Sequence, residues 1–331
     1  MKLNRRTFLG ASAAAAASTT LFTPSLALAQ SQSFRLGIAT PPGHPWNNAA
    51  LAAAEMIAEE SDGRLDLTVF HASQLGTEAA MLQQLQTGAL DFAWLQTAEL
   101  GTRIPQIAAI NAPYLVQSTA KIPDLIRHPK VLELLDLLPA ETGTIGLGWG
   151  ITGMRSVFAN REVNSVADLQ GMKLRTHTTP AFRDFYELLG TAPTPIPTPQ
   201  VYDAIANGQV DGLEADLDFS WNQRFDQVTQ SILHMNALFM PMVALVSGRV
   251  WQGLPEADRE ILDRATKTAL EAQVDELVGN EAGLLTAFEE TGIAISTVGE
   301  ADVADLIERY DAKWVELAPN LPELRAASAE I

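Results

Sequence analysis

Short apolar runs alternate with longer amphipathic segments along the first half of the chain. Between residues 45 and 58 the apolar side chains recur at intervals of three and four, which is the spacing of a helix with one buried face. The apolar runs on either side are too short for helices and are typical of strands. The pattern therefore predicts strands at 34–40, 65–70, 90–96 and 144–149, and helices at 45–58, 78–86 and 119–138.

A second series of the same kind follows, and a long charged helical segment comes near its end. The alternation of strands with helices is typical of open α/β sheets, in which helices cover both faces. A helix as long as the predicted segment 255–291 can contact both halves of a molecule of this size. The second half is predicted to contain strands at 154–159, 172–176, 210–214, 242–247 and 293–298, and helices at 181–189, 200–207, 255–291 and 302–317.

The two series share a similar junction. Residues 85–91 and 205–211 each combine the end of a helix, a glycine that can adopt the left-handed cap conformation, and the start of a strand. Any helix-to-strand junction looks alike, but two matching series also fit two lobes that face one cleft. The predicted fold class is α/β, with two doubly wound lobes, a ligand cleft between them and a long bracing helix. The predicted boundaries are 30–152 with 241–281 for lobe I, and 153–240 with 282–331 for lobe II.

The first 29 residues have the pattern of an export signal. Arg5 and Arg6 precede a long alanine-rich apolar run that ends in small residues at Ala29. A membrane anchor is the alternative, but Ser, Thr and Pro24 interrupt the run and no stop-transfer pattern follows it. The sequence therefore predicts a twin-arginine signal peptide at 1–29 and a periplasmic mature protein.

The charge of the chain limits its partners. The chain contains 22 Lys and Arg residues and 40 Asp and Glu residues, for a net charge of −18, and it has no cysteine. Without cysteine there is no disulfide, thiolate metal site or cysteine nucleophile. Removal of Lys2, Arg5 and Arg6 with the signal leaves 19 basic residues and a net charge of about −21, which disfavours nucleic acid as a partner. An anion site must then be built from a few local arginines, because salt screens exposed charges beyond about 8 Å.

Several short motifs, taken together, resemble the substrate-binding subunits of tripartite ATP-independent periplasmic (TRAP) transporters of the dicarboxylate type. The resemblance implies two lobes that close on a small organic acid, namely a dicarboxylate, a sugar acid or an oxo-acid, without bond chemistry or a cofactor. It also implies delivery of the ligand to integral membrane TRAP permease subunits, driven by an ion gradient. The motifs are residues 41–47 (PPGHPWN), 73–76 (SQLG), 148–150 (GWG) with Arg155 beyond them, Leu174-Arg175, 193–195 (PTP) and 210–214 (VDGLE).

Two arginines are the main candidates for the binding site. The resemblance implies that Arg175 holds a ligand carboxylate and that Arg155 helps. A guanidinium group suits this role because its planar fork meets both carboxylate oxygens and keeps its charge when buried. Each arginine also has a structural alternative: Arg175 at a strand end could pair with Asp168 or Glu214, and Arg155 could hold Glu214 and the hinge.

The remaining candidates are polar or aromatic residues near predicted strand ends. Gln96 occupies a position where the family often has a polar side chain of the first lobe, and Thr40 ends the first predicted strand at the mouth of the cleft. Among the aromatic residues, Trp94, Trp149 and Phe219 are expected to wall the cleft, where they would stack on the carbon atoms of a ligand.

The chain departs from the family pattern next to Glu214. Many relatives have an asparagine directly after this glutamate, whereas this chain has Ala215, followed by Asp216 and Asp218. The loss of the amide and the nearby acids favour ligands with hydroxyl or amino groups over a plain dicarboxylate. A receptor for a neutral or zwitterionic ligand, such as an amino acid or polyol bound through Asp216 or Asp218, is therefore an alternative.

An exported NAD(P)-dependent oxidoreductase is a second alternative. Residues 148–153 match G-x-G-x-x-G, and Asp168 follows at the expected spacing. A dinucleotide motif must open a helix, however, and residues 154–159 have the pattern of a strand. The five histidines include no close pair that would suggest a metal site. His177 could contact a ligand, but a structural or solvent-facing role is the preferred interpretation.

Overall fold

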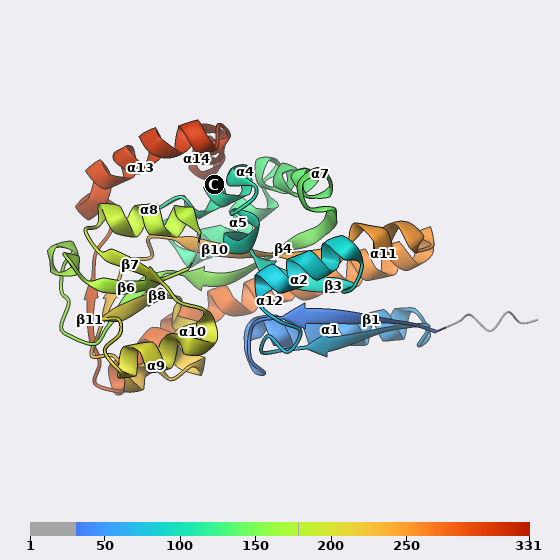
Figure 1. Cartoon of the computed structure of the whole chain (residues 1–331), viewed down its shortest axis with the longest axis horizontal. Coiled ribbons are helices and arrows are strands. Elements are labelled where there is room, and N and C mark those ends of the chain that lie inside the picture. The colour runs from blue at the N-terminus through green and yellow to red at the C-terminus, as the bar shows by residue number, and fades with distance from the viewer. Residues whose placement is uncertain (1–30, 178) are drawn as a thin grey trace, which may run out of the picture.

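A computed structural model describes residues 31–177 and 179–331 of the chain (Figure 1). The predicted signal peptide lies outside these residues, so it stays a prediction. The described part forms two α/β lobes, which confirms the predicted fold class. We call the part built on the five-stranded sheet lobe I and the part built on the six-stranded sheet lobe II.

Lobe I contains a mixed sheet with the strand order β2-β1-β3-β10-β4. The first three strands pair in parallel, and β10 runs antiparallel to both β3 and β4. Alternate residues of β10 enter different cores: Met242 and Ala244 pack on the α1 and α12 side, and Val243 packs on the opposite side. The strands are β1 (Gln32–Ile38), β2 (Leu65–Phe70), β3 (Phe92–Gln96), β4 (Thr144–Met154) and β10 (Phe239–Ser247).

Lobe II contains the second sheet, with the order β11-β9-β5-β8-β6-β7. The pair β6 and β8 is parallel, whereas β5 runs antiparallel to β8 and β9. The carboxyl ends of β6 and β8 therefore lie at the same edge of this sheet, which brings the residues that follow them together. The strands are β5 (Ser156–Ala159), β6 (Lys173–Thr176), β7 (Ala192–Pro195), β8 (Gly212–Ala215), β9 (Ser231–His234) and β11 (Ala294–Thr297).

Two strand crossings join the lobes. The first passes from β4 through Arg155 into β5, and the second passes from β9 into β10. The crossings are hydrogen-bonded to each other, because the Arg155 backbone N–H donates to the Leu238 carbonyl at 2.8 Å and Ala237 N–H donates to the Arg155 carbonyl at 3.3 Å. Arg155 therefore lies at the point where both connections leave one sheet for the other.

A single long helix, α12 (Glu256–Glu290), provides the third connection and matches the predicted bracing helix. It packs against α1 (Pro45–Glu60) and β4 in lobe I and against α10 (Leu217–Asn222) in lobe II. Gln273 fixes it to β4, since its side chain accepts from Ile151 N–H at 3.1 Å and donates to the Ile151 carbonyl at 2.9 Å.

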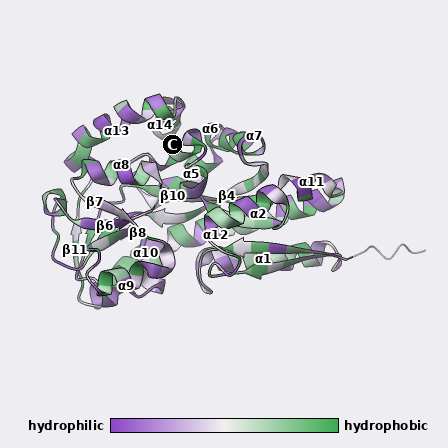
Figure 2. Cartoon of the chain, viewed as in Figure 1, coloured by the Kyte–Doolittle hydropathy of each residue, from purple (hydrophilic) through white to green (hydrophobic). Residues whose placement is uncertain are grey.

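The other helices cover the sheets, and Figure 2 shows hydrophilic residues interspersed along the peripheral helices α11, α13 and α14. Among the residues described, no helix combines the length and the apolar character needed to cross a bilayer. The helices are α2 (Glu78–Thr87), α3 (Thr97–Leu100), α4 (Pro105–Ala108), α5 (Ile122–Arg127), α6 (Pro129–Leu132), α7 (Leu138–Thr142), α8 (Pro180–Leu188), α9 (Val201–Ala206), α11 (Gly248–Gly253), α13 (Ala304–Leu317) and α14 (Leu321–Ala329).

The prediction of one helix over 119–138 is wrong. The segment is a series of short helices, and prolines stand in the first turns of α5, α6 and α7. Between α5 and α6, His128 is extended, with ψ 136°, because the following Pro129 disfavours a helical conformation there. Proline lacks the backbone N–H that a continuous helix needs, so it begins new helices instead of extending one.

The chain end returns to lobe I. Helix α13 packs on α8 of lobe II, whereas α14 packs beside α6. Arg325 donates to the Pro113 carbonyl at 2.9 Å, and Lys121 donates to the Ile331 carbonyl at 2.8 Å. The residue boundaries that we predict for the two lobes stay a prediction, but the final helix contacts elements within the range predicted for lobe I.

Candidate ligand-binding site

A small polar cavity lies where the two lobes meet at the strand crossings. Its volume is about 20 Å³, which suffices for about one water molecule. A sugar acid needs far more room, so a ligand of that size requires the lobes to move apart or side chains to rearrange. The lining residues are Ala39, Thr40, His44, Gln96 and Thr152 from lobe I, and Arg155, His177, Thr198, Asp216 and Phe219 from the crossing and lobe II.

Arg155 is the central charged residue of this cavity. Only 2% of it is exposed, and its guanidinium group donates to Asp216 Oδ2 at 2.7 Å and lies 2.9 Å from His177 Nε2. Its Nε lies 3.4 Å from Glu214 Oε2, and the group stacks over the Phe182 ring. The guanidinium is thus held by side chains of lobe II, which supports the hinge role that we considered as the alternative for this residue.

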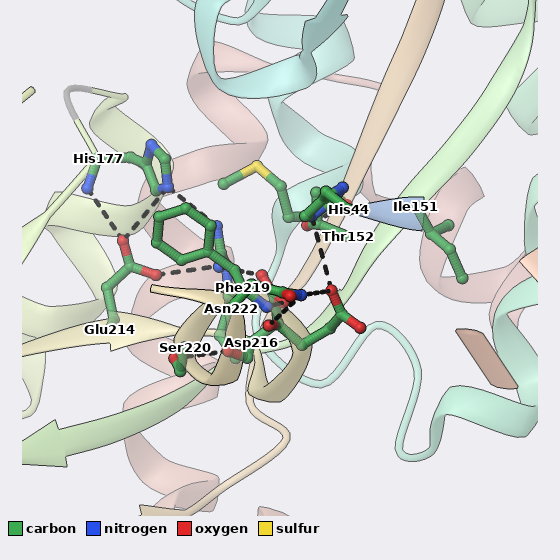
Figure 3. Close-up of polar contacts among 12 residues, drawn as sticks. His44, Ile151, Thr152, His177, Glu214, Asp216, Phe219, Ser220 and Asn222 are labelled. Carbon is green, nitrogen blue, oxygen red and sulfur yellow. Dashed lines mark hydrogen bonds and ion pairs between the residues drawn. The ribbon is translucent and has the colours of Figure 1, made fainter. Parts of the chain in front are cut away.

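Asp216 is committed to two partners of its own. As the N-cap of α10, its Oδ1 accepts from Phe219 N–H at 2.8 Å, and its other oxygen binds Arg155 (Figure 3). Burial raises the pKa of Asp216, and Arg155 opposes this effect. The capping role also explains the local sequence, because an aspartate before a short helix satisfies a backbone N–H that would otherwise lack a partner.

Arg175 lies behind the cavity, at the end of β6. Its Nε donates to the Ile196 carbonyl at 3.0 Å, and its Nη1 lies 3.8 Å from Glu214 Oε1, which is an ion pair too long for a hydrogen bond. Burial lowers the pKa of Arg175 to about 10, so the group stays charged at neutral pH. Of the two carboxylates considered as its partner, Glu214 is the neighbour, whereas Asp168 caps a turn by accepting from Ser165.

Glu214 joins the two arginines. It is fully buried at β8, and its Oε1 accepts from His177 N–H at 3.0 Å (Figure 3). Burial raises the pKa of Glu214, whereas Arg155 and Arg175 favour its charged form. Two guanidinium groups and two carboxyl groups, those of Glu214 and Asp216, therefore form a compact ion cluster within lobe II.

The lobe I wall of the cavity is neutral and has buried hydrogen-bonding atoms without partners among the described residues. Thr40 Oγ1 and Gln96 Oε1 are buried and have no hydrogen-bond partner among the described residues. The Gln96 backbone N–H donates to Glu78 Oε1 at 2.9 Å, and burial of the Glu78 carboxyl group raises its pKa to about 7. The structure thus brings both predicted lobe I residues, Thr40 and Gln96, to the cavity.

Sequence reasoning missed His44, which is fully buried and lines the cavity. Its Nδ1 accepts from Trp46 N–H at 3.1 Å, so the histidine caps α1. Burial, with a contribution from Arg155, lowers the pKa of His44 to about 3. The available signal was its position directly before Pro45, since a residue that precedes a first-turn proline is the N-cap of a helix.

Of the three aromatic residues that we expect at the cleft, only Phe219 lines the cavity. Phe219 lines the cavity and packs against Phe225, but Trp149 lies elsewhere, which is contrary to our expectation. Trp149 lines a different cavity of about 450 Å³ between α5, β4 and α12, and Trp94 lies in the core of lobe I beneath α1. His177, for which we preferred a structural role, is bonded to Arg155 and also lines the cavity.

The glycine motif at 148–153 does not form a dinucleotide site. All six positions lie within β4, and the chain continues into β5 instead of a helix. Small residues are needed here for packing: a Cβ atom on Gly150 would lie 2.6 Å from the Met242 side chain, and one on Gly148 would lie 3.0 Å from Leu270 of α12.

Two α/β lobes that are joined by crossing strands and a long helix, with a buried polar cavity between them, define a solute receptor of the periplasmic binding protein type. The chain belongs to a family described as bacterial extracellular solute-binding protein, family 7, whose sequence profile matches residues 36–320. This match confirms the resemblance to TRAP substrate-binding proteins that the motifs indicate. The family is one of solute-binding proteins and not of enzymes.

Individual proteins show the same relationship. The chain is 32% identical over 302 residues to the protein y4mM of Sinorhizobium fredii, and this match spans 91% of the chain but only 55% of y4mM. It is 26% identical over 262 residues to the sialic acid-binding periplasmic protein SiaP of Vibrio cholerae, covering 79% of the chain and 82% of that protein. A TRAP periplasmic solute-binding protein from Haemophilus influenzae with bound L-gulonate has the same fold, with a TM-score of 0.85, 19% identity and coverage of 90% and 99%.

Proposed function

We propose that the chain is the periplasmic solute receptor of a TRAP transporter and that it binds a small organic acid, with a sugar acid as the favoured class. Family membership supports the receptor role. The observation that carries the ligand class is the cavity between the lobes, which Arg155 lines together with the neutral polar side chains of Thr40, His44 and Gln96. Relatives named for sialic acid and L-gulonate bind acids of this kind.

In this proposal Arg175 is the residue that holds the ligand carboxylate. Its pair with Glu214 is long, at 3.8 Å, so its hydrogen-bonding capacity is not taken up by that partner. A charge-assisted contact from a buried arginine contributes roughly 1.5 to 3 kcal/mol. Arg155 is already held by Asp216 and His177, so we assign it mainly to orienting the cluster and the crossing strands.

The mechanism is binding followed by lobe closure, without bond chemistry. The strand crossings, α12 and the passage from α13 to α14 are the connections about which the lobes would move, with the lobe boundaries as predicted from the sequence. The closed form would deliver its ligand to integral membrane TRAP permease subunits. Export by the signal at 1–29 would place the receptor in the periplasm, where such a permease collects its substrate.

A neutral or zwitterionic ligand is the competing class. The cavity offers it less than the sequence suggests, because Asp216 already caps α10 and binds Arg155. An ammonium group would therefore have to compete with a guanidinium for this carboxylate, and burial of a second unpaired cation is costly. Asp218, which is half-buried, is the remaining acid for such a ligand.

A thermal-shift screen of the mature protein tests the proposal. The panel contains C4-dicarboxylates, sugar acids, oxo-acids, amino acids, polyols and nicotinamide cofactors. A ligand at about 100 times its dissociation constant adds roughly 2.7 kcal/mol to the free energy of unfolding, which is readily seen. We expect one acid class to raise the melting temperature and the Arg175→Ala variant to abolish the effect. Shifts produced only by polyols, amino acids or cofactors would overturn the proposal.

A further inference from the structure

The proton of His44 has a defined position. Its Nδ1 is occupied as an acceptor from Trp46 N–H, and the low pKa, which results from burial, keeps the ring neutral. A neutral imidazole carries one proton, so that proton must be on Nε2. The N-cap contact thus fixes the tautomer, and the ring presents an uncharged N–H donor toward the lobe interface.

This donor has no hydrogen-bond acceptor among the described residues, although the Nε2 atom is buried. The nearest carboxylate oxygen is Asp218 Oδ1 in α10 of lobe II, at 4.0 Å (Figure 3). That separation is too long for a direct hydrogen bond, but one oxygen atom can lie within hydrogen-bond distance of both groups. Thr152 and Asp216 border both the candidate cavity and the small adjoining cavity that Asp218 lines, so the two spaces are neighbours.

We propose that His44 and Asp218 together bind one hydroxyl group of the ligand, from lobe I and lobe II respectively. The inference rests on the proposed function and specifies that the ligand is a polyhydroxy acid. In this arrangement the hydroxyl oxygen accepts from His44 Nε2–H, and the hydroxyl proton is donated to Asp218.

The chemistry of the pair excludes other groups at this position. A ligand carboxylate could accept from His44, but it would lie against the carboxyl group of Asp216 and, above the pKa of about 7 of Asp218, against a second carboxylate, where like charges repel. An ammonium group could bind Asp218, but it has no lone pair for the His44 N–H and would leave that donor unsatisfied. Of these three ligand groups, only a hydroxyl group both accepts and donates, so it satisfies both partners, in the way that a water molecule would without the ligand.

The location on two lobes gives the contact a second effect. His44 begins α1 in lobe I, whereas Asp218 lies in the first turn of α10 in lobe II. A hydroxyl group between them therefore links the lobes directly, and an acid that lacks it closes the receptor with one interlobe contact fewer. Asp218 is already oriented for this role, because Asn222 Nδ2 donates to its Oδ1 at 2.9 Å.

A matched pair of variants separates this role from helix capping. His44→Asn retains an acceptor for Trp46 N–H, but its shorter side chain has no donor at the position of His44 Nε2. His44→Gln retains a donor of similar reach but is a poor N-cap. Affinities for L-gulonate, D-galactonate, D-gluconate and succinate are measured by titration calorimetry on the mature protein, and melting temperatures are measured without ligand.

We expect His44→Asn to weaken binding of the sugar acids at least about 10-fold, with little change in melting temperature. His44→Gln should lower the melting temperature yet keep sugar acid affinity within about 3-fold. Asp218→Asn should also weaken binding, and combining it with His44→Asn should cost less than the sum of the two, since both remove one contact.

Each outcome decides the inference. If His44→Asn binds the sugar acids as tightly as the wild type, or if His44→Gln loses as much affinity as His44→Asn, the assignment is wrong. If the wild type binds succinate as well as any sugar acid, the hydroxyl contact is also excluded. If it binds none of the four acids, this inference fails, and the proposed function fails as well if no acid of the thermal-shift panel binds. Arg175→Ala distinguishes the two claims. If Arg175→Ala loses affinity for the acids while His44→Asn binds them as tightly as the wild type, only the hydroxyl contact is overturned and the proposed function stands.

Discussion

The two walls of the interlobe cavity differ in charge and in the partners of their polar groups. The lobe II wall is an ion cluster in which Arg155, Glu214 and Asp216 bind one another. The lobe I wall is neutral, and Thr40 and Gln96 have buried oxygen atoms without hydrogen-bond partners among the described residues. The comparison indicates that ion pairs hold the charged groups of lobe II in place, whereas Thr40 and Gln96 of lobe I offer neutral hydrogen-bonding groups that a ligand can satisfy.

Removal of Arg155 should have the largest effect, and it should be on folding. Arg155→Met leaves Glu214 and Asp216 buried without their main cation, and breaking a buried ion pair costs about 3 to 5 kcal/mol. Urea unfolding measures the loss. As a control, Arg264→Met removes an exposed ion pair with Glu60 and should cost less than about 1 kcal/mol. Equal losses in the two variants would mean that the lobe II cluster does not stabilise the fold.

Arg175→Lys should affect binding more than folding. Lysine keeps the positive charge but cannot contact two carboxylate oxygens in the planar geometry of a guanidinium. We expect the affinity for an organic acid to fall roughly 10- to 100-fold, measured by titration calorimetry. The exposed Arg183 of α8 offers the matched control, and its replacement by lysine should leave affinity unchanged. An unchanged affinity in Arg175→Lys would show that lobe II does not hold the carboxylate through this residue.

The walls can also be compared through pH, because each has an acid whose pKa burial raises to about 7. Burial raises the pKa of Glu78 behind the lobe I wall to about 7 and that of Asp218 in lobe II to about 7. The folded state then holds these protons more tightly than the unfolded chain, so the stability that these two groups contribute is fully present below their unfolded pKa values and is lost as pH rises through about 7.

Thermal unfolding at about pH 5 and about pH 7.5 measures this dependence. Glu78→Gln and Asp218→Asn should each reduce the difference in melting temperature between the two conditions. The exposed Glu141 provides the control, and Glu141→Gln should not change the difference. A full pH dependence in both the Glu78 and Asp218 variants would assign the effect to other groups.

The smallest effect concerns a single hydroxyl group. Thr40→Val removes a buried hydroxyl without a partner among the described residues, so stability should be unchanged or slightly higher, while ligand affinity falls about 3-fold or more. Thr97→Val is the matched control, since its buried hydroxyl donates to Asn111 Oδ1 at 3.0 Å. That variant should lose about 1 kcal/mol of stability without a change in affinity. If Thr40→Val left the affinity unchanged and Thr97→Val lowered it, the Thr40 hydroxyl would not contact the ligand.

Much of the fold could be predicted because periodicity reports local structure. The predicted strand 65–70 coincides with β2, and the predicted segment 255–291 matches α12 within one residue at each end. The prediction of one helix over 119–138 is wrong because apolar spacing reports burial, whereas the prolines of the segment begin new helices and so divide it.

The sequence predicts a site residue correctly only where a sequence motif coincides with a strand end at the junction of the lobes. Arg155, Asp216 and Phe219 meet at the cavity because they follow strand ends at the lobe junction. Trp149 was misplaced because the direction of a side chain on a strand depends on register, which the sequence does not specify. His44 was missed because its importance depends on a tautomer fixed by a backbone contact that only the fold reveals.

The return of the C-terminal helix to lobe I has a consequence for how motion of this protein can be observed. Both β1 and the Ile331 carbonyl, which accepts from Lys121, belong to lobe I, so labels at the two ends of the described chain would move together. A spectroscopic distance between them would stay constant while the cleft opened. Because the chain contains no cysteine, a single pair introduced at the exposed Glu55 of α1 and Gln209 beyond α9 would report the angle between the lobes without background labelling.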